Sequence, residues 1–236
     1  MRNQLLVYML ALAVALNAYS DFSFSGHVKI NEDGTAHVTE KTVFLFETPE
    51  ERKAFEINMN LGESTILEWK KFSNNIGYHI SGIANNSKIT AKREFTVSFE
   101  AGTVIVEYDT NNLFHQQLVG SRRTTFDLDA GLLSFERTKT GQMSLGNNMD
   151  LTFEYPKGSD LLKVAPVYEQ EGNLVVWRGP IAGIWEFSYA REIPLSQEVS
   201  EFFVDTYNTA IEKLPLLLLS GFSLLVLFVL VKFGRK

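Results

Sequence analysis

Apolar and polar residues alternate along much of this chain, which is the pattern of β-strands with one buried face. In Phe22 to Ile30, and again in Ala36 to Phe46, most apolar side chains stand at even positions. A three-residue loop, Glu32-Asp33-Gly34 with Gly34 in the left-handed region, places both apolar sets on the same face. The pattern therefore predicts a hairpin with three defined pairs: Ile30 with Ala36, Val28 with Val38, and Phe22 with Phe44.

A helix-start signal follows the hairpin. Thr48 is a capping residue, Pro49 suits the first helical position, and Glu51 completes a capping box. These residues predict a short helix that runs to about Asn60, ends near Gly62 and buries Phe55, Ile57 or Met59.

Beyond this helix, short apolar or alternating runs recur between clusters of Gly, Asn, Asp and Pro, and we interpret them as strands. The segment Asp109 to Ser121 is predicted to be irregular. About ten short strands with a single short helix are typical of a mainly β protein, here an antiparallel β-sandwich. The predicted strands are Thr65 to Lys70, Gly77 to Ile83, Lys88 to Phe99, Thr103 to Tyr108, Thr124 to Leu128, Leu132 to Phe135, Met149 to Tyr155, Leu161 to Val164, Leu174 to Trp177 and Ile184 to Tyr189.

The pattern is different at both ends of the chain. Leu214 to Val231 runs eighteen residues without a charge and is followed by Lys232, Arg235 and Lys236. Such a run is long enough for one membrane-spanning helix, and the basic cluster predicts that the tail, residues 232–236, is cytoplasmic. Residues 1–20 have the pattern of a signal peptide, with a retained anchor as the alternative. Both signals predict that the domain formed by residues 21–192 is extracellular.

Residues 193–213 have a helical period. Apolar residues, among them Phe202, Phe203 and Tyr207, recur at intervals of three and four, and acidic residues occupy the positions between them. This predicts an amphipathic juxtamembrane helix whose apolar stripe packs on the β-domain. The alternatives are pairing with another subunit, which makes these three aromatic residues candidate partner contacts, and a position in the lipid interface.

Composition and charge exclude several kinds of chemistry and several kinds of ligand. The chain has 236 residues, 45% of them hydrophobic, and no Cys, which excludes disulfides and thiolate chemistry. Between Asp21 and Lys213, 18 Lys and Arg stand against 28 Asp and Glu, a net charge near −10. Nucleic acid and anionic lipid need concentrated positive charge, so neither is expected to bind this domain.

Residues with catalytic or ligating chemistry are few. In the predicted hairpin, His27 and His37 are diagonal neighbours on the polar face with Lys29 opposite His37, which favours surface histidines over a metal pair. Asp127 and Asp129 share one strand face but lack the spacing of a calcium loop. There is no phosphate-binding glycine loop, nucleophile elbow or metalloprotease motif. We therefore expect no catalytic residues, no metal and no cofactor.

Three surface features remain as candidates. Asn85 begins the chain's glycosylation sequon, Asn85-Asn86-Ser87, in a predicted turn. Arg122 and Arg123 form a basic pair at the end of the predicted irregular segment and are candidate partner contacts. The three tryptophans could form a sugar-binding platform, although Trp177 and Trp185 lie in apolar runs typical of core.

Three stretches resemble an uncharacterised exported domain of archaeal membrane proteins: VKINEDGTAHVTEKTVFLFETPEERKAFE (Val28 to Glu56), GTVIVEYDTNNLF (Gly102 to Phe114) and DLTFEYPKGSDLLKVAPVYEQEGNLVVWRGP (Asp150 to Pro180). In haloarchaeal relatives this domain precedes a membrane helix and often a winged helix-turn-helix module. Here about five residues follow the predicted membrane helix, so that module is not expected.

These observations lead to one functional prediction and two alternatives. We expect a non-enzymatic, membrane-anchored cell-surface protein that binds or scaffolds an envelope or membrane protein, with the lipid bilayer contacted through Leu214 to Val231. The first alternative is a sensor subunit that signals through a partner membrane or helix-turn-helix protein. The second is an ectoenzyme that uses carboxylates.

Overall fold

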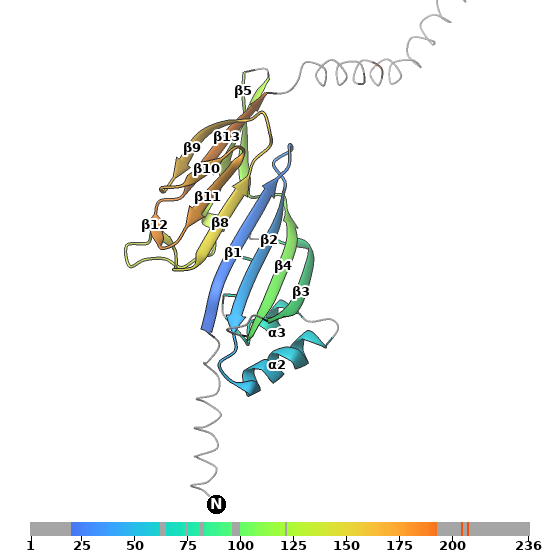
Figure 1. Cartoon of the computed structure of the whole chain (residues 1–236). Helices are drawn as coiled ribbons and strands as arrows, with labels where there is room; N and C mark the ends of the chain where they lie inside the picture. The colour runs from blue at the N-terminus through green and yellow to red at the C-terminus, as the bar shows by residue number, and fades with distance from the viewer. Residues whose placement is uncertain are drawn as a thin grey trace, which may run out of the picture. The chain divides into compact units, whose positions relative to one another are not determined.

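The computed structural model describes residues 20–61, 65–73, 75–80, 83–95, 100–120, 122–192, 204 and 207. The chain divides into two compact units, Met1–Arg191 and Glu192–Lys236. The described residues of the first unit form a mainly β structure with few helices, as the alternation predicts (Figure 1).

Thirteen strands and three sheets are present in the described part of the chain. The largest sheet has the order β10-β11-β8-β1-β2-β4-β3, the second has the order β5-β6-β13-β9, and β12 pairs with β7. The strands are β1 (Ser20–Ile30), β2 (Ala36–Leu45), β3 (Asn85–Phe95), β4 (Glu100–Thr110), β5 (Phe114–Val119), β6 (Arg123–Leu128), β7 (Met143–Leu145), β8 (Met149–Glu154), β9 (Asp160–Ala165), β10 (Glu169–Glu171), β11 (Leu174–Arg178), β12 (Ile181–Gly183) and β13 (Glu186–Glu192).

The β1–β2 hairpin has the predicted loop. Ile30 pairs with Ala36 and Val28 with Val38, and Gly34 has a φ of 83°. The third predicted pair is wrong. A register irregularity between Asp21 and Ser23 leaves Asp21 opposite Phe44, because one extra residue is accommodated at Phe22.

The main sheet contains one parallel pairing. Strand β8 runs parallel to β1, with Gly26 opposite Leu151 and Val28 opposite Phe153 (Figure 1). The other pairings of this sheet, β1–β2, β2–β4, β3–β4, β8–β11 and β10–β11, are antiparallel. The prediction of a mainly antiparallel sandwich does not specify this parallel pair. Residue alternation specifies which face of a strand is buried but not the direction of its neighbour.

The predicted capping box begins helix α2 (Pro49–Met59). Thr48 accepts a hydrogen bond from the Glu51 N–H, and Glu51 accepts one from the Thr48 N–H. Phe55 is fully buried, whereas Ile57 is exposed. A second short helix, α3 (Ile66–Trp69), replaces the predicted strand Thr65 to Lys70, so the prediction of a single helix is wrong.

Three further predictions of local structure are wrong. The segment Asp109 to Ser121, predicted to be irregular, contains the end of β4 and all of β5. The predicted strand Leu132 to Phe135 follows a short 3₁₀ turn, Ala130–Leu132, and forms no ladder. The described part of Gly77 to Ile83 is also not a strand.

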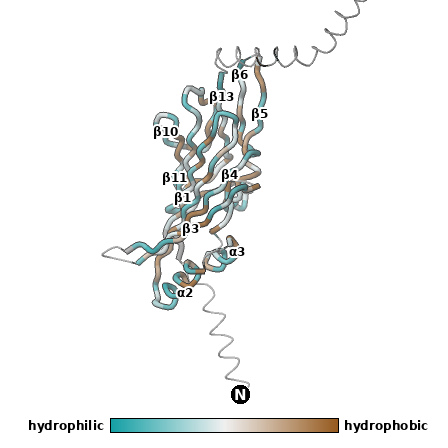
Figure 2. The backbone as a smooth tube through the Cα atoms, turned by 90° about the vertical axis from the view of Figure 1, so that its right-hand side faces the viewer, coloured by the Kyte–Doolittle hydropathy of each residue, from teal (hydrophilic) through white to brown (hydrophobic). Residues whose placement is uncertain are grey.

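Aromatic side chains make up about half of the buried core residues. Trp69, Trp177 and Trp185 are all buried, so the tryptophans form no sugar-binding platform. Phe153 of the main sheet meets Phe187 of the four-stranded sheet with ring centroids 5.0 Å apart. Figure 2 shows apolar and polar segments following one another along the strands, as expected for strands with one buried face.

The predicted terminal segments lie largely outside the described residues. This applies to the signal peptide up to residue 19, to Phe202 and Phe203, and to the predicted membrane span Leu214 to Val231. Val204 and Tyr207 are helical and exposed. Within the described ranges, no helix is long and apolar enough to cross a membrane.

Candidate functional site

A buried carboxylate lies at the centre of the candidate site. Glu40 is in the middle of β2, where the inward positions alternate with outward ones, and it occupies an inward position with only 2% of its surface exposed. A buried carboxylate is costly unless hydrogen bonds replace its lost water. Glu40 has three donors around it, two from His79 and one from Tyr108.

His79 supplies the first two donors. It lies between α3 and β3, in a segment without regular structure. Its backbone N–H donates to Oε1 of Glu40 at 2.7 Å, and its Nδ1–H donates to Oε2 at 2.6 Å. The carboxylate therefore fixes both the position of this segment and the orientation of the imidazole ring.

Tyr108 supplies the third donor from strand β4. Its hydroxyl accepts the N–H of Ile80 at 3.2 Å and donates to Oε1 of Glu40 at 2.5 Å. Burial, followed by the nearby charge of Glu40, raises the pKa of the Tyr108 phenol. The phenol therefore keeps its proton and acts as a fixed donor. Glu40, His79 and Tyr108 together are called the Glu40 network below.

Two phenylalanine rings pack against the imidazole of His79. Phe135 is stacked on it at 5.4 Å with an interplanar angle of 17°, and Phe24 meets it edge-on at 5.1 Å. The segment that carries Phe135 is attached to the His79 segment, because the Ser134 N–H donates to the His79 carbonyl at 2.8 Å. These contacts leave the imidazole ring little freedom to rotate.

A cavity of about 470 Å³ adjoins the network, and His79 forms part of its wall. Nε2 of His79 has no hydrogen-bond partner among the described residues, whereas Nδ1 is held by Glu40. His79 thus lines the cavity with one ring nitrogen, Nδ1, held by Glu40 and the other, Nε2, left available. The other lining residues are Ser23, Phe24, Thr42, Asn75, Ser134, Phe135, Glu136, Ser144, Gly146, Asn147 and Met149.

The remaining histidines are on the surface and make separate ion pairs. His27 contacts Glu154 at 3.3 Å, His37 contacts Asp109 at 2.7 Å, and His115 contacts Asp129 at 3.4 Å. The hydrogen bond from His37, followed by that from Asn86, lowers the pKa of Asp109. In the described part of the chain, no three His, Asp or Glu side chains are grouped closely enough to hold a metal ion.

The sequence-predicted surface candidates lie away from the Glu40 network. Asn85 is exposed at the start of β3, where the register is irregular before Lys88, so it is in a strand rather than a turn. Arg122 precedes β6, and Arg123, its first residue, forms an ion pair with Asp160 at 3.0 Å. Asn85 pairs with Asp109, the residue that His37 contacts, and none of the three candidates lines the cavity beside His79.

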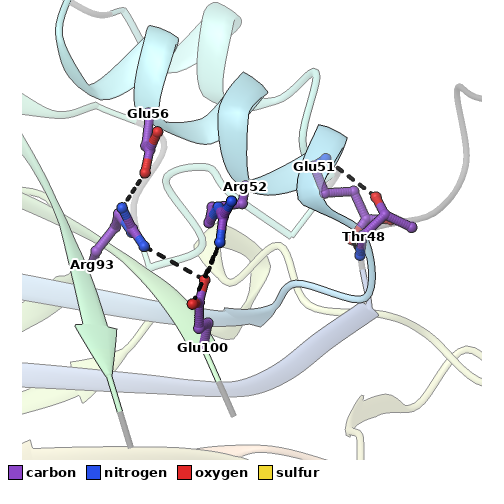
Figure 3. A network of polar contacts seen from close by, with 6 residues as sticks. All are labelled: Thr48, Glu51, Arg52, Glu56, Arg93 and Glu100. Atoms are coloured by element: carbon purple, nitrogen blue, oxygen red, sulfur yellow. Dashed lines mark hydrogen bonds and ion pairs between the residues drawn. The ribbon is translucent and has the colours of Figure 1, made fainter.

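A second polar network fastens helix α2 to the sheet (Figure 3). The guanidinium of Arg93 on β3 contacts Glu56 of α2 and lies 3.5 Å from Glu100 of β4. Arg52, also on α2, contacts Glu100 at 3.1 Å. These bonds cross from the helix to two strands, so we interpret this network as structural.

Comparisons with known proteins identify no family for this chain. No protein-family model and no curated protein matches it. The folded domain of LppM from Mycobacterium tuberculosis, solved by NMR, is similar over 75% of this chain and 94% of that domain, with 9% sequence identity and a TM-score of 0.33. Similarity at this level carries no functional argument, and the resemblance to archaeal exported domains stays a prediction.

Proposed function

We propose that this chain is an exported, membrane-anchored binding protein of the cell envelope, without catalytic activity, and that its β-domain binds a small ligand in the cavity beside the Glu40 network. The observation that carries the proposal is that His79 lines the cavity while its Nε2 has no hydrogen-bond partner among the described residues. Polar groups of buried side chains are normally paired, and an unpaired one that lines a cavity is available to a ligand.

The dimensions and lining of the cavity support ligand binding. A volume of about 470 Å³ lies within the range of small-molecule sites, which is roughly 300–1,000 Å³. The lining combines buried rings, Phe24 and Phe135, with a few polar groups that could fix a ligand's orientation.

The arrangement of the sheets and the anchoring belong to the same proposal. We infer that the two larger sheets pack face to face as a β-sandwich, supported by the contact of Phe153 with Phe187 across them. Leu214 to Val231 then holds this domain at the membrane, and an envelope or membrane protein partner is reached from the outer side. The uncharged length of that segment supports the anchoring.

A methyl NMR experiment on the full-length chain in detergent micelles tests the binding function. The chain has five methionines, of which Met149 lines the cavity and Met59 does not, so the methyl of Met149 reports on the site. We expect members of a panel of sugars, alcohols, amines, carboxylic acids and small aromatics to shift the Met149 methyl resonance and leave Met59 unchanged.

Two variants provide the control for this experiment. Asn147→Trp places a large ring at the exposed side of the cavity and should abolish the Met149 shifts. Lys157→Trp changes an exposed residue away from this cavity and should leave the shifts intact. If no compound of any class moves Met149 in the wild-type chain, the binding function is wrong.

A further inference from the structure

We propose that the ligand of this cavity is a neutral, polyhydroxylated small molecule, of the size of a mono- or disaccharide, that donates a hydroxyl hydrogen bond to Nε2 of His79. This inference rests on the proposed function, since it requires that the cavity binds a ligand. It adds the chemical class of that ligand and the atom that recognises it.

The first step is the tautomer of His79. Oε1 of Glu40 accepts both the His79 backbone N–H and the Tyr108 hydroxyl, whose own lone pair is used by the Ile80 N–H. An ionised carboxylate only accepts hydrogen bonds, so Oε2 requires the proton on Nδ1 of His79. In a neutral imidazole one nitrogen donates and the other accepts. In the neutral ring Nε2 is therefore the acceptor, and we assign this form to the His79 side chain that lines the cavity.

The second step is the charge of the lining. Among its described residues there is no Lys or Arg, and Glu136 contributes a carboxylate at an exposed position. A carboxylate or phosphate ligand would meet the lone pair of His79 Nε2 and the charge of Glu136 with no fixed cation to offset them. The cavity therefore selects against anions and favours ligands that carry hydrogen-bond donors.

The third step is the density of hydroxyl and amide groups. Beside His79, six lining side chains can both donate and accept hydrogen bonds, and only Phe24, Phe135 and Met149 are apolar. The Ser134 and Ser144 hydroxyls donate to the carbonyls of Tyr78 and Glu136 and can still accept. An apolar ligand would offer these side chains no hydrogen bond in place of water, whereas a molecule with many hydroxyls offers them both donors and acceptors. The six residues are Ser23, Thr42, Asn75, Ser134, Ser144 and Asn147.

The tautomer can be read directly in the full-length wild-type chain. Long-range ¹H–¹⁵N correlation spectra of the histidine rings distinguish a protonated from an unprotonated nitrogen. For His79 we expect the proton on Nδ1 and an unprotonated Nε2 at neutral pH. The opposite tautomer, or a ring that carries protons on both nitrogens, would overturn the proposal without any variant being needed.

The ligand class is tested with matched sugars on the same Met149 methyl signal. Neutral hexoses and disaccharides should bind, and the uronic acid of a binding hexose should bind at least about tenfold more weakly. Replacing single hydroxyls by fluorine removes a donor and keeps the size. At the position that contacts Nε2, this replacement should cost about tenfold in affinity.

A variant of Glu40 separates recognition from mere packing. In Glu40→Gln the amide oxygen must stay with the two donors at Oε1, so the NH₂ group faces Nδ1 and the proton moves to Nε2. The cavity then presents a donor, and the fluorinated sugar should regain most of its lost affinity. A loss of fluorosugar binding that is equal in wild type and Glu40→Gln would overturn the role of Nε2.

The outcomes also separate this inference from the proposed function. If no sugar shifts the Met149 methyl resonance but an apolar alcohol or an amine does, the cavity binds ligands and the assignment of the ligand as a polyhydroxylated molecule is wrong. If the uronic acid binds as well as the hexose, the charge argument is wrong. If Glu40→Gln does not fold, Asn147→Leu, which removes one exposed amide from the lining, must weaken hexose binding for the proposal to stand.

Discussion

The hydroxyl of Tyr108 donates a 2.5 Å hydrogen bond to Oε1 of Glu40, although the two residues lie 68 positions apart in the chain. Strands β2 and β4 are adjacent in the main sheet, with Val38 opposite Tyr108, and this pairing brings the two side chains together. The same bond helps to hold the carboxylate that orients His79. Fold stability and the geometry of the cavity therefore depend on the same atoms.

Tyr108→Phe should destabilise the folded chain by about 1–3 kcal/mol, because it removes a donor from buried Glu40 and leaves the Ile80 N–H without its acceptor. Chemical unfolding of the full-length chain, followed by fluorescence, measures this loss. The three tryptophans are all buried, so their emission reports unfolding. An unchanged unfolding midpoint would mean that the Tyr108–Glu40 hydrogen bond makes no net contribution to the free energy of unfolding.

Tyr189→Phe is the matched control, because Tyr189 is equally buried but its hydroxyl has no hydrogen-bond partner among the described residues. Burial raises the pKa of its phenol, so the group stays neutral. Removing this unpaired hydroxyl should be neutral or should stabilise the fold by up to about 1 kcal/mol. A loss as large as that for Tyr108→Phe would show that ring packing, rather than the Glu40 bond, dominates both results.

The Glu40 network was only partly predictable from the sequence. Glu40 stands at an even position of Ala36 to Phe46, where the alternation assigns inward residues, so a charged residue there is a detectable break in the pattern. The two residues that bond to Glu40, His79 and Tyr108, do not break the pattern of the sequence around them. His79 lies in a segment without periodicity, and Tyr108 reads as one more apolar residue of a strand. The pairing of β2 with β4 brings Tyr108 to Glu40, and the path of the segment between α3 and β3 brings His79 to it.

Local signals predicted the fold best where their cause was local. The hairpin loop around Gly34 and the capping box of α2 depend on residues within five positions of one another, and both are confirmed. Helix α3 has the same kind of signal, a capping box of Thr65 with Glu68, which the strand interpretation missed. The parallel pairing of β8 with β1 joins residues more than a hundred positions apart, and no local pattern encodes it.

Gly34→Ala should destabilise the fold by about 2–3 kcal/mol. Gly34 has a φ of 83°, which costs an alanine about 1 kcal/mol, and its new Cβ would lie 2.8 Å from Cε1 of Phe126. Gly120→Ala is the control, because Gly120 has a φ of 74° with nothing within 4 Å. That variant should lose only about 1 kcal/mol. Equal losses in thermal unfolding would contradict the predicted overlap with Phe126.

The ion pairs around Arg93 should make a measurable contribution to stability. A double-mutant cycle with Arg93→Met and Glu56→Gln should give a coupling of about 0.5–1 kcal/mol, because this pair is partly buried and holds α2 on the sheet (Figure 3). The more exposed pair Lys92–Glu94 is the control and should give a coupling near zero. Added salt should weaken the first coupling. A value for Arg93–Glu56 no larger than that of the control would contradict its structural role.

Asp33 should make the stability of the β1–β2 hairpin depend on pH. The Thr35 hydroxyl donates to the Asp33 carboxylate at 2.7 Å and the Thr35 N–H donates at 3.0 Å, and these bonds lower the pKa of Asp33 below its ordinary value of 3.8. A carboxyl whose pKa is lower in the folded state stabilises the fold above its unfolded pKa. This stabilisation is lost as the pH falls through the folded pKa.

Comparison of wild type with Asp33→Asn isolates this effect, because the asparagine carbonyl can accept the same two bonds but does not titrate. Near pH 7 the wild type should be more stable by about 0.5 kcal/mol, since charge strengthens both bonds and solvent screens them at this exposed turn. As the pH falls below 3.8 and through the lowered folded pKa of Asp33, the wild-type advantage should disappear, which melting temperatures measured across a series of acidic buffers would show. Parallel curves for the two proteins would show that protonation of Asp33 is not linked to folding, and that the turn is held by the conformation of Gly34 instead.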